Sequence, residues 1–114
     1  MDSLEPWLDP VLYVFAVVPI DSAVPDCAVA SIKEDEGLTA VLPEYLATGM
    51  TKSEPMRRIT IRLETSLTMV GLTADFSAKL ADACIPANVI AGYYHDHIFV
   101  PAAMAEQALA VLSP

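Results

Sequence analysis

The tripeptide His95-Asp96-His97 holds the side chains of this chain that are best suited to chemistry. Imidazole and carboxylate groups bind zinc or nickel, and two histidines two residues apart in a strand point to one face. The chain has no other histidine, and no third or fourth ligand is evident. We therefore favour a hairpin turn with polar side chains, one histidine making a pH-sensitive hydrogen bond, and keep metal binding as an alternative.

The residues around this turn predict a β-hairpin. An apolar run over 89–94 precedes the tripeptide, and a second run over 98–100 follows and stops at Pro101. Tyr93 and Tyr94 are adjacent, so a strand would direct them to opposite faces. We expect one ring to pack inward and the other to be exposed, either in ordinary sheet packing or as a ligand wall or dimer contact.

A second candidate site is the turn from Thr65 to Gly71. Thr65 and Ser66 offer hydroxyl groups, and a helix beginning near Gly71 offers free backbone N–H groups that attract a carboxylate. Simple N-capping of that helix is the plainer interpretation, and we favour it. Gly71 predicts a backbone geometry, or a close approach, that a Cβ would obstruct.

Catalysis has little support in the sequence. The chain contains no Gly-rich phosphate loop, no GxSxG motif and no evident Cys–His pairing. Cys27 and Cys84 match no metal-ligand spacing, and Cys84 is predicted to be a small buried hydrophobe. We expect no enzyme activity, no catalytic residue, no bound metal and no cofactor.

Composition narrows the classes of partner. The chain has 114 residues, 54% of them apolar, and 15 acidic residues against 6 Lys and Arg give a net charge of −9. Such a charge disfavours nucleic acid and anionic membranes as partners. The longest apolar stretch, 11–20, contains Pro19 and is too short to span a bilayer, and no basic segment leads into an apolar one at the start. We expect a cytoplasmic protein with reduced thiols.

Periodicity predicts an α+β, ferredoxin-like antiparallel sheet with helices on one face. Residues 58–64 alternate strictly between apolar and polar, as in a half-buried strand. Helical segments at 74–85 and 102–112 flank the hairpin, which gives the order β-α-β-β-α. Residues 12–18 and 38–42 also predict strands, and Pro43 opens a short helix over 44–48.

The layout over 28–48 echoes that over 89–112, so we predict two degenerate half-modules. Residues 1–10 form a loose N-terminal arm, 11–56 a truncated first half-module and 57–114 a second βαββα module. The second module lacks a final strand, and we expect Leu12–Val18 to fill that place. The missing strand and the short edge strands favour a homodimer.

The segment from Ile59 onward resembles a small family of bacterial ACT-domain proteins that was formerly known only as a domain of unknown function. The motif SSLxxVGLTA stands here as 65–74, with Thr65 where serine is expected, NVxAGYYHDHxFVP stands as 88–101, and the final helix AEEALxxL as 105–112. The upstream EGLTAVLP, 36–43, resembles the family's first half.

The resemblance implies a non-catalytic regulatory module that binds an amino acid or similar small carboxylate where the first strand turns into the first helix, frequently at an interface between two such domains. Gly71 matches the glycine that lets a backbone approach the ligand. A homodimerisation module without a ligand, and a small metal protein or enzyme using His95 and His97, stay open as alternatives. The expected ligand-binding residues are Thr65, Ser66, Val70, Gly71, Leu72, Asn88, Tyr93 and Tyr94.

Overall fold

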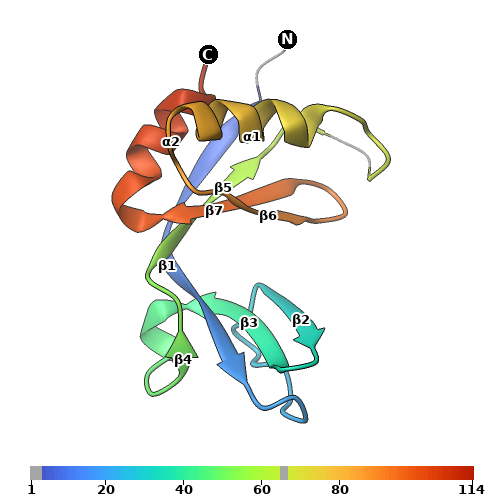
Figure 1. Cartoon of the computed structure of the whole chain (residues 1–114), viewed down its shortest axis with the longest axis vertical. Coiled ribbons are helices and arrows are strands. Elements are labelled where there is room, and N and C mark those ends of the chain that lie inside the picture. The colour runs from blue at the N-terminus through green and yellow to red at the C-terminus, as the bar shows by residue number, and fades with distance from the viewer. Residues whose placement is uncertain (1–3, 65–66) are drawn as a thin grey trace. The chain divides into compact units, whose positions relative to one another are not determined.

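The structure, a computed structural model, describes residues 4–64 and 67–114. The expected ligand residues Thr65 and Ser66 lie outside this described part. The chain divides into two compact units: Met1–Pro10 with Arg57–Pro114, here called the helical unit, and Val11–Met56, here called the strand unit. Figure 1 shows the elements of each, and each unit is described by itself.

The helical unit has the α+β, ferredoxin-like arrangement that the sequence predicts. It contains β5 (Met56–Ile61), α1 (Leu72–Asp82), β6 (Asn88–Ala91), β7 (Asp96–Pro101), the 3-10 turn η2 (Ala102–Met104) and α2 (Ala105–Leu112). With the first residues of β1 (Pro6–Val18), the strand order is β1-β5-β7-β6. Both helices cover the same face of these strands (Figure 1).

The core of this unit forms between that sheet face and the two helices. Alternation along β5 directs Ile59 and Ile61 into the core, as predicted, and Leu63 packs against it. The apolar stripe of α1 supplies Phe76 and Leu80, which are both fully buried. The other buried members of the cluster are Leu4, Leu72, Ile85, Ile98, Val100, Ala105, Ala108 and Leu112.

The loose N-terminal arm expected over 1–10 is wrong from Leu4 onward. Leu4 belongs to the buried core, and the backbone N–H groups of Arg62 and Leu63 donate to the carbonyls of Glu5 and Leu4 at 3.1 and 3.2 Å. The strand that completes this sheet therefore begins at Pro6, earlier in β1 than the expected Leu12. The prolines in this segment suggested a loop, but an edge strand tolerates residues that lack a backbone N–H.

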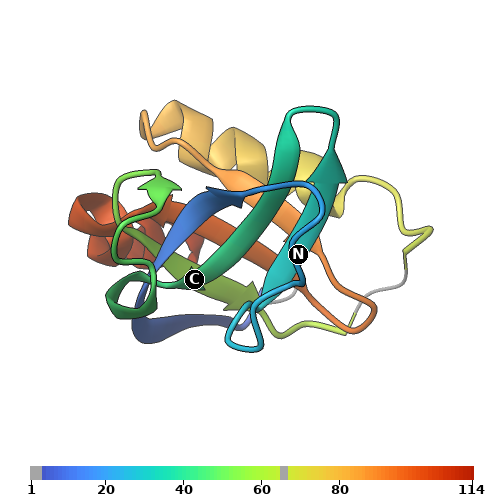
Figure 2. The same ribbon diagram turned by 90° about the horizontal axis from the view of Figure 1, so that it is seen from below.

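The strand unit contains the rest of β1, β2 (Ala30–Glu34), β3 (Gly37–Pro43), the 3-10 turn η1 (Glu44–Leu46) and β4 (Thr51–Lys52). β3 pairs antiparallel with β1 from Tyr13↔Pro43 to Val18↔Leu38, and with β2, and this hairpin is drawn in teal in Figure 2. β4 also pairs with β1, at Ala16↔Lys52 and Val17↔Thr51. The buried core cluster of the strand unit is small and consists of Val14, Ala16, Ala40, Leu42 and Ala47.

The echo between the two halves of the sequence is present in the structure. Pro43 and Pro101 each end a strand and precede a 3-10 turn, with φ and ψ of −56° and 135° at Pro43 and −52° and 134° at Pro101. The helix expected over 44–48 is shorter than predicted and consists of that single turn. No helix of the described residues is long and apolar enough to cross a membrane.

Candidate ligand site

A hollow opens in the helical unit where the chain enters α1. It is small, with a volume of about 90 Å³, and its lining comes from three places: the segment before α1, the first turn of α1, and the facing ends of β6 and β7. The lining residues are Leu67, Met69, Leu72, Thr73, Ala91, Gly92 and Asp96.

Gly71 determines how the chain enters α1. Its φ of +97° lies in the left-handed region, where residues other than glycine are strained, and the N–H of Asp75 donates to its carbonyl at 3.0 Å. A Cβ on Gly71 would meet no atom within 4 Å. Of the two roles expected for this glycine, the structure therefore supports the unusual backbone geometry, and the close approach of a ligand to its backbone stays a prediction.

Gly92 forms the facing wall of the hollow, and sequence reasoning missed it. Its N–H donates to the carbonyl of His95 at 2.9 Å, which closes the turn between β6 and β7. A Cβ on Gly92 would lie 2.9 Å from that oxygen and 3.3 Å from Nε2 of His97. A side chain here would force the turn or the imidazole to move, so the wall depends on this glycine. In the sequence, the indication of this role was the position of Gly92 between a predicted strand and the tyrosine pair.

Asp96 supplies the one charged side chain among the described lining residues. Sequence analysis grouped it with the histidines and did not expect it to contact a ligand. It begins β7, where its backbone pairs with Ala91, and its side chain is half-buried. Within 4–64 and 67–114, no hydrogen bond or ion pair to its carboxylate is found. A carboxylate in such a hollow is available to a cationic or N–H-bearing group.

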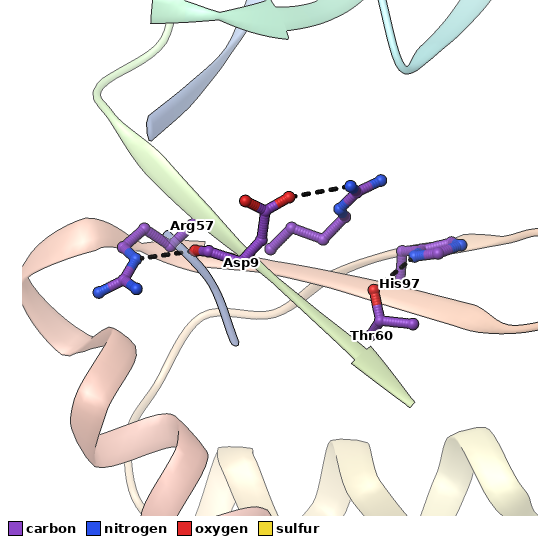
Figure 3. Close-up of polar contacts among 5 residues, drawn as sticks. Asp9, Arg57, Thr60 and His97 are labelled. Carbon is purple, nitrogen blue, oxygen red and sulfur yellow. Dashed lines mark hydrogen bonds and ion pairs between the residues drawn. The ribbon is translucent and has the colours of Figure 1, made fainter. Parts of the chain in front are cut away.

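Polar contacts join β1, β5 and β7 (Figure 3). On the sheet face opposite the helices, Arg58 Nη2 donates to Oδ2 of buried Asp9 at 2.9 Å, and Thr60 Oγ1 and His97 Nδ1 lie 3.0 Å apart. Arg57, the neighbour of Arg58 in β5, donates from Nε to the Asp9 carbonyl at 3.1 Å and lies 3.6 Å from Glu106 of α2.

His97 is neutral over a wider pH range than a free histidine. Partial burial lowers the pKa of His97 below its usual 6.5; the nearby charges of Arg58 and His95 lower it further, and Asp96 opposes them. The hydrogen bond to Thr60 is the kind of histidine interaction that the sequence favoured. Among the described residues, no group of three or more His, Cys, Asp and Glu side chains is placed to hold a metal ion.

Most of the described residues that were expected to bind a ligand lie outside the hollow. Leu72 lines it and Gly71 directly precedes it, whereas Val70 is 95% exposed and the Asn88 amide donates to the Phe99 carbonyl at 3.2 Å. The ligand-binding assignment of these residues stays a prediction.

The tyrosine pair departs from its expected arrangement. Tyr93 and Tyr94 are both exposed, and their rings contact edge to face with centroids 5.0 Å apart. The inward packing of one of them is wrong, because β6 ends at Ala91 and both residues lie in the turn, where strand alternation does not apply. Cys84, expected to be buried, is also exposed, at the end of α1.

Two ACT-domain family models match the chain, one over residues 53–114 and the other over residues 1–55. Together with the fold of the helical unit, these matches show that the chain belongs to the ACT-domain family. ACT domains are regulatory modules that bind ligands. A comparison with curated proteins found no match.

Solved structures have a similar fold. A Vibrio cholerae protein of unknown function, described as a possible transport protein, is 45% identical, with a TM-score of 0.88 over 98% of this chain and 88% of that one. An Agrobacterium tumefaciens protein is 17% identical, with a TM-score of 0.76 over 90% and 81%. The ligand-free regulatory subunit of aspartate kinase from Thermus thermophilus is 11% identical, with a TM-score of 0.69 over 94% and 92%. The last two likenesses concern the fold alone.

Proposed function

We propose that this protein is a non-catalytic ACT-type regulatory module that binds an amino acid or a similar small carboxylate in the hollow of the helical unit. The observation that carries the proposal is the place of the hollow, at the entry of the chain into α1. The first N–H groups of a helix have no partner within it, and the helix dipole favours negative charge there. Leu72 and Thr73 bring that helix end to the lining.

A thermal-shift series with the twenty amino acids tests this function. A ligand that binds only the folded state, present at 100 times its Kd, stabilises the protein by about 2.7 kcal/mol and raises its Tm. Ala91→Phe, which places a ring in the hollow, should abolish the shift. Ala81→Phe, on the exposed side of α1 near its far end, is the matched control and should retain it. A flat response to every compound would contradict the proposal.

We further propose that the protein forms a homodimer. The expectation of a missing strand no longer supports this, because β1 fills that place, but β6 is an edge strand of the helical unit. The exposed Tyr93 and Tyr94 closely follow β6 in the chain, the exposed Met69 lines the same hollow as Ala91 of β6, and all three offer apolar surface. Light scattering at micromolar concentration should give about twice the 12.2 kDa of one chain. A monomer at all concentrations would refute the dimer. A dimer with no ligand response would favour a purely structural pairing module.

A cytoplasmic location belongs to the same proposal, supported by two free cysteines, Cys27 and Cys84. The remaining alternative, a metal protein or enzyme using His95 and His97, is tested by metal analysis of metal-replete protein. Stoichiometric zinc or nickel, lost on chelation together with a large fall in Tm, would favour that alternative.

A further inference from the structure

The His97 side chain lies between β5 and the turn that joins β6 to β7. Its Nδ1 lies 3.0 Å from Thr60 Oγ1 (Figure 3), and its Nε2 lies 3.3 Å from the point where a Cβ on Gly92 would stand. The Gly92 N–H closes the turn by donating to the carbonyl of His95 at 2.9 Å. Ala91, which ends β6, and Gly92 both line the hollow. A displacement of the imidazole toward the turn would therefore move a wall of the hollow.

The charged groups around His97 mostly oppose a positive charge on its ring. Arg58 of β5 lies close enough to repel such a charge, although Asp9 of β1 binds its guanidinium at 2.9 Å. Within the turn and β7, His95 also repels a positive charge and Asp96 attracts it. β6, which pairs with β7, carries no ionisable residue. Partial burial acts in the same direction as the repulsion, and together they lower the pKa of His97 below its usual value.

The hydrogen bond to Thr60 is also affected by a proton on His97. In the neutral form, Nδ1 can accept a hydrogen bond from the Thr60 hydroxyl, whereas both ring nitrogens of a protonated imidazole are donors. The hydroxyl of Thr60 then becomes the acceptor, and its own proton needs another partner. Thr60 is 7% exposed, so water is scarcely available for that purpose. The charged ring is therefore better accommodated once it has moved toward water.

We propose that the turn between β6 and β7 is a pH-sensitive wall, which opens locally when His97 is protonated and so removes the surface that Ala91 and Gly92 present to the hollow. An open turn returns His97 to an ordinary pKa near 6.5. The population of open turns therefore rises as the pH falls below that value, by up to about tenfold per pH unit. Regulation of ligand binding by this turn rests on the proposed function of the hollow, whereas the opening itself does not.

Amide hydrogen exchange of the full chain tests the opening, because the Gly92 N–H is released when the turn opens. After correction for the intrinsic pH dependence of exchange, its protection factor should fall at least about threefold between pH 7.5 and 5.5. The Ser22 N–H closes a turn of the strand unit by donating to the Pro19 carbonyl at 2.8 Å, and this matched control should keep its protection. His97→Gln should remove the pH dependence at Gly92, and His95→Gln should leave it intact.

Two results would overturn the opening. One is a Gly92 protection factor that does not change with pH, and the other is a value equal to that of the Phe76 amide in α1 at every pH, which would mean that the turn opens only when the whole unit unfolds. An NMR pH titration of the unmodified protein decides the matter if His97→Gln fails to fold. The ring signals of His97 and the amide signals of Ala91 and Gly92 should then share one midpoint below pH 6.5, and different midpoints would overturn the proposal.

A thermal-shift series at pH 7.5 and 5.5 tests the link to the hollow. The probes are the amino acids other than histidine, which itself titrates in this range. An amino acid that raises Tm at pH 7.5 should give a smaller shift at pH 5.5, and His97→Gln should give equal shifts at both. Equal shifts in the unmodified protein would overturn the regulation of the hollow by pH. No shift at either pH would overturn the proposed function, while hydrogen exchange still decides whether the turn opens.

Discussion

Thr60 Oγ1 and His97 Nδ1 lie 3.0 Å apart across neighbouring strands, on the sheet face opposite the helices. Thr60 is 7% exposed, so its hydroxyl is largely withdrawn from water and His97 is its polar partner in β7. The same imidazole lies behind Gly92, because a Cβ on that glycine would meet its Nε2. The His97 side chain therefore lies next to both Thr60 in the sheet and Gly92 in the wall of the hollow.

The lowered pKa of His97 predicts that stability falls as the solution becomes acidic. The folded protein binds this proton less readily than the unfolded chain, whose histidine has a pKa near 6.5. As the pH drops below 6.5 toward the folded pKa, the unfolded state takes up more protons, and the free energy of unfolding decreases. Urea unfolding between pH 5.5 and 8 should show this slope, and His97→Gln should reduce it. His95→Gln is the control, and an equal loss of slope there would contradict the assignment to His97.

The left-handed φ of +97° at Gly71 predicts a backbone cost for other residues. Gly71→Ala should destabilise the protein by about 1 kcal/mol, and Gly71→Val by more, because a Cβ is disfavoured in that conformation whatever space surrounds it. Gly71→Asn should cost less than Gly71→Ala, since asparagine tolerates the left-handed region. Chemical denaturation measures all three. Equal stability of the alanine variant and the unmodified protein would refute this role for Gly71.

Cys84 is the opposite case to Gly71, because it carries a Cβ at a position where glycine is preferred. Its φ is +58°, its N–H donates to the Ala81 carbonyl at 2.9 Å, and the N–H of Ile85 donates to the Leu80 carbonyl at 2.9 Å. Such a helix end most often carries glycine. Cys84→Gly should therefore stabilise the protein by about 0.5–1 kcal/mol, visible as a higher Tm. Cys84→Ala keeps the Cβ and should leave Tm nearly unchanged; a gain of equal size would point to the thiol rather than the backbone.

The ion pair between Asp9 and Arg58 predicts a non-additive pair of substitutions. The Asp9 side chain is 6% exposed and that of Arg58 22%, so removing the guanidinium leaves a carboxylate in a poorly hydrated place. Arg58→Leu should cost about 2 kcal/mol, less than for a fully buried pair because Arg58 is partly solvated. Asp9→Leu combined with Arg58→Leu should recover much of that loss. Strict additivity of the two effects in denaturant unfolding would argue against a coupled pair.

The sequence predicted the fold well where periodicity is strong. Strict alternation along β5 gave the core positions of Ile59 and Ile61, and the helical stripe gave Phe76 and Leu80. The start of β1 was missed because Pro6 and Pro10 suggest a loop, and the buried Leu4 and partly buried Leu8 reveal an edge strand only when β5 is known to lie beside them. The sequence predicts a strand at Tyr93 and Tyr94, where the structure has a turn, because aromatic residues are enriched in strands.

The position of the candidate site in the fold could be predicted from the sequence, but most of the residues that line it could not. A glycine at a strand-to-helix turn indicated the entry to α1, and Leu72 does line the hollow. Asp96 and Gly92 contribute through the pairing of β6 with β7, where Ala91 opposes Asp96. That register depends on the length of the turn between β6 and β7, and the sequence alone does not show where this turn begins and ends.

The most direct test of the account is a backbone amide NMR titration of the protein with each of the twenty amino acids in turn. The account predicts shifts that saturate and that centre on Leu72, Thr73, Ala91, Gly92 and Asp96, the described residues around the hollow, with the strand unit little affected. The same titration of Ala91→Phe should show no saturable change. Saturable shifts centred elsewhere in the chain, or none with any amino acid, would contradict a ligand site at the entry to α1.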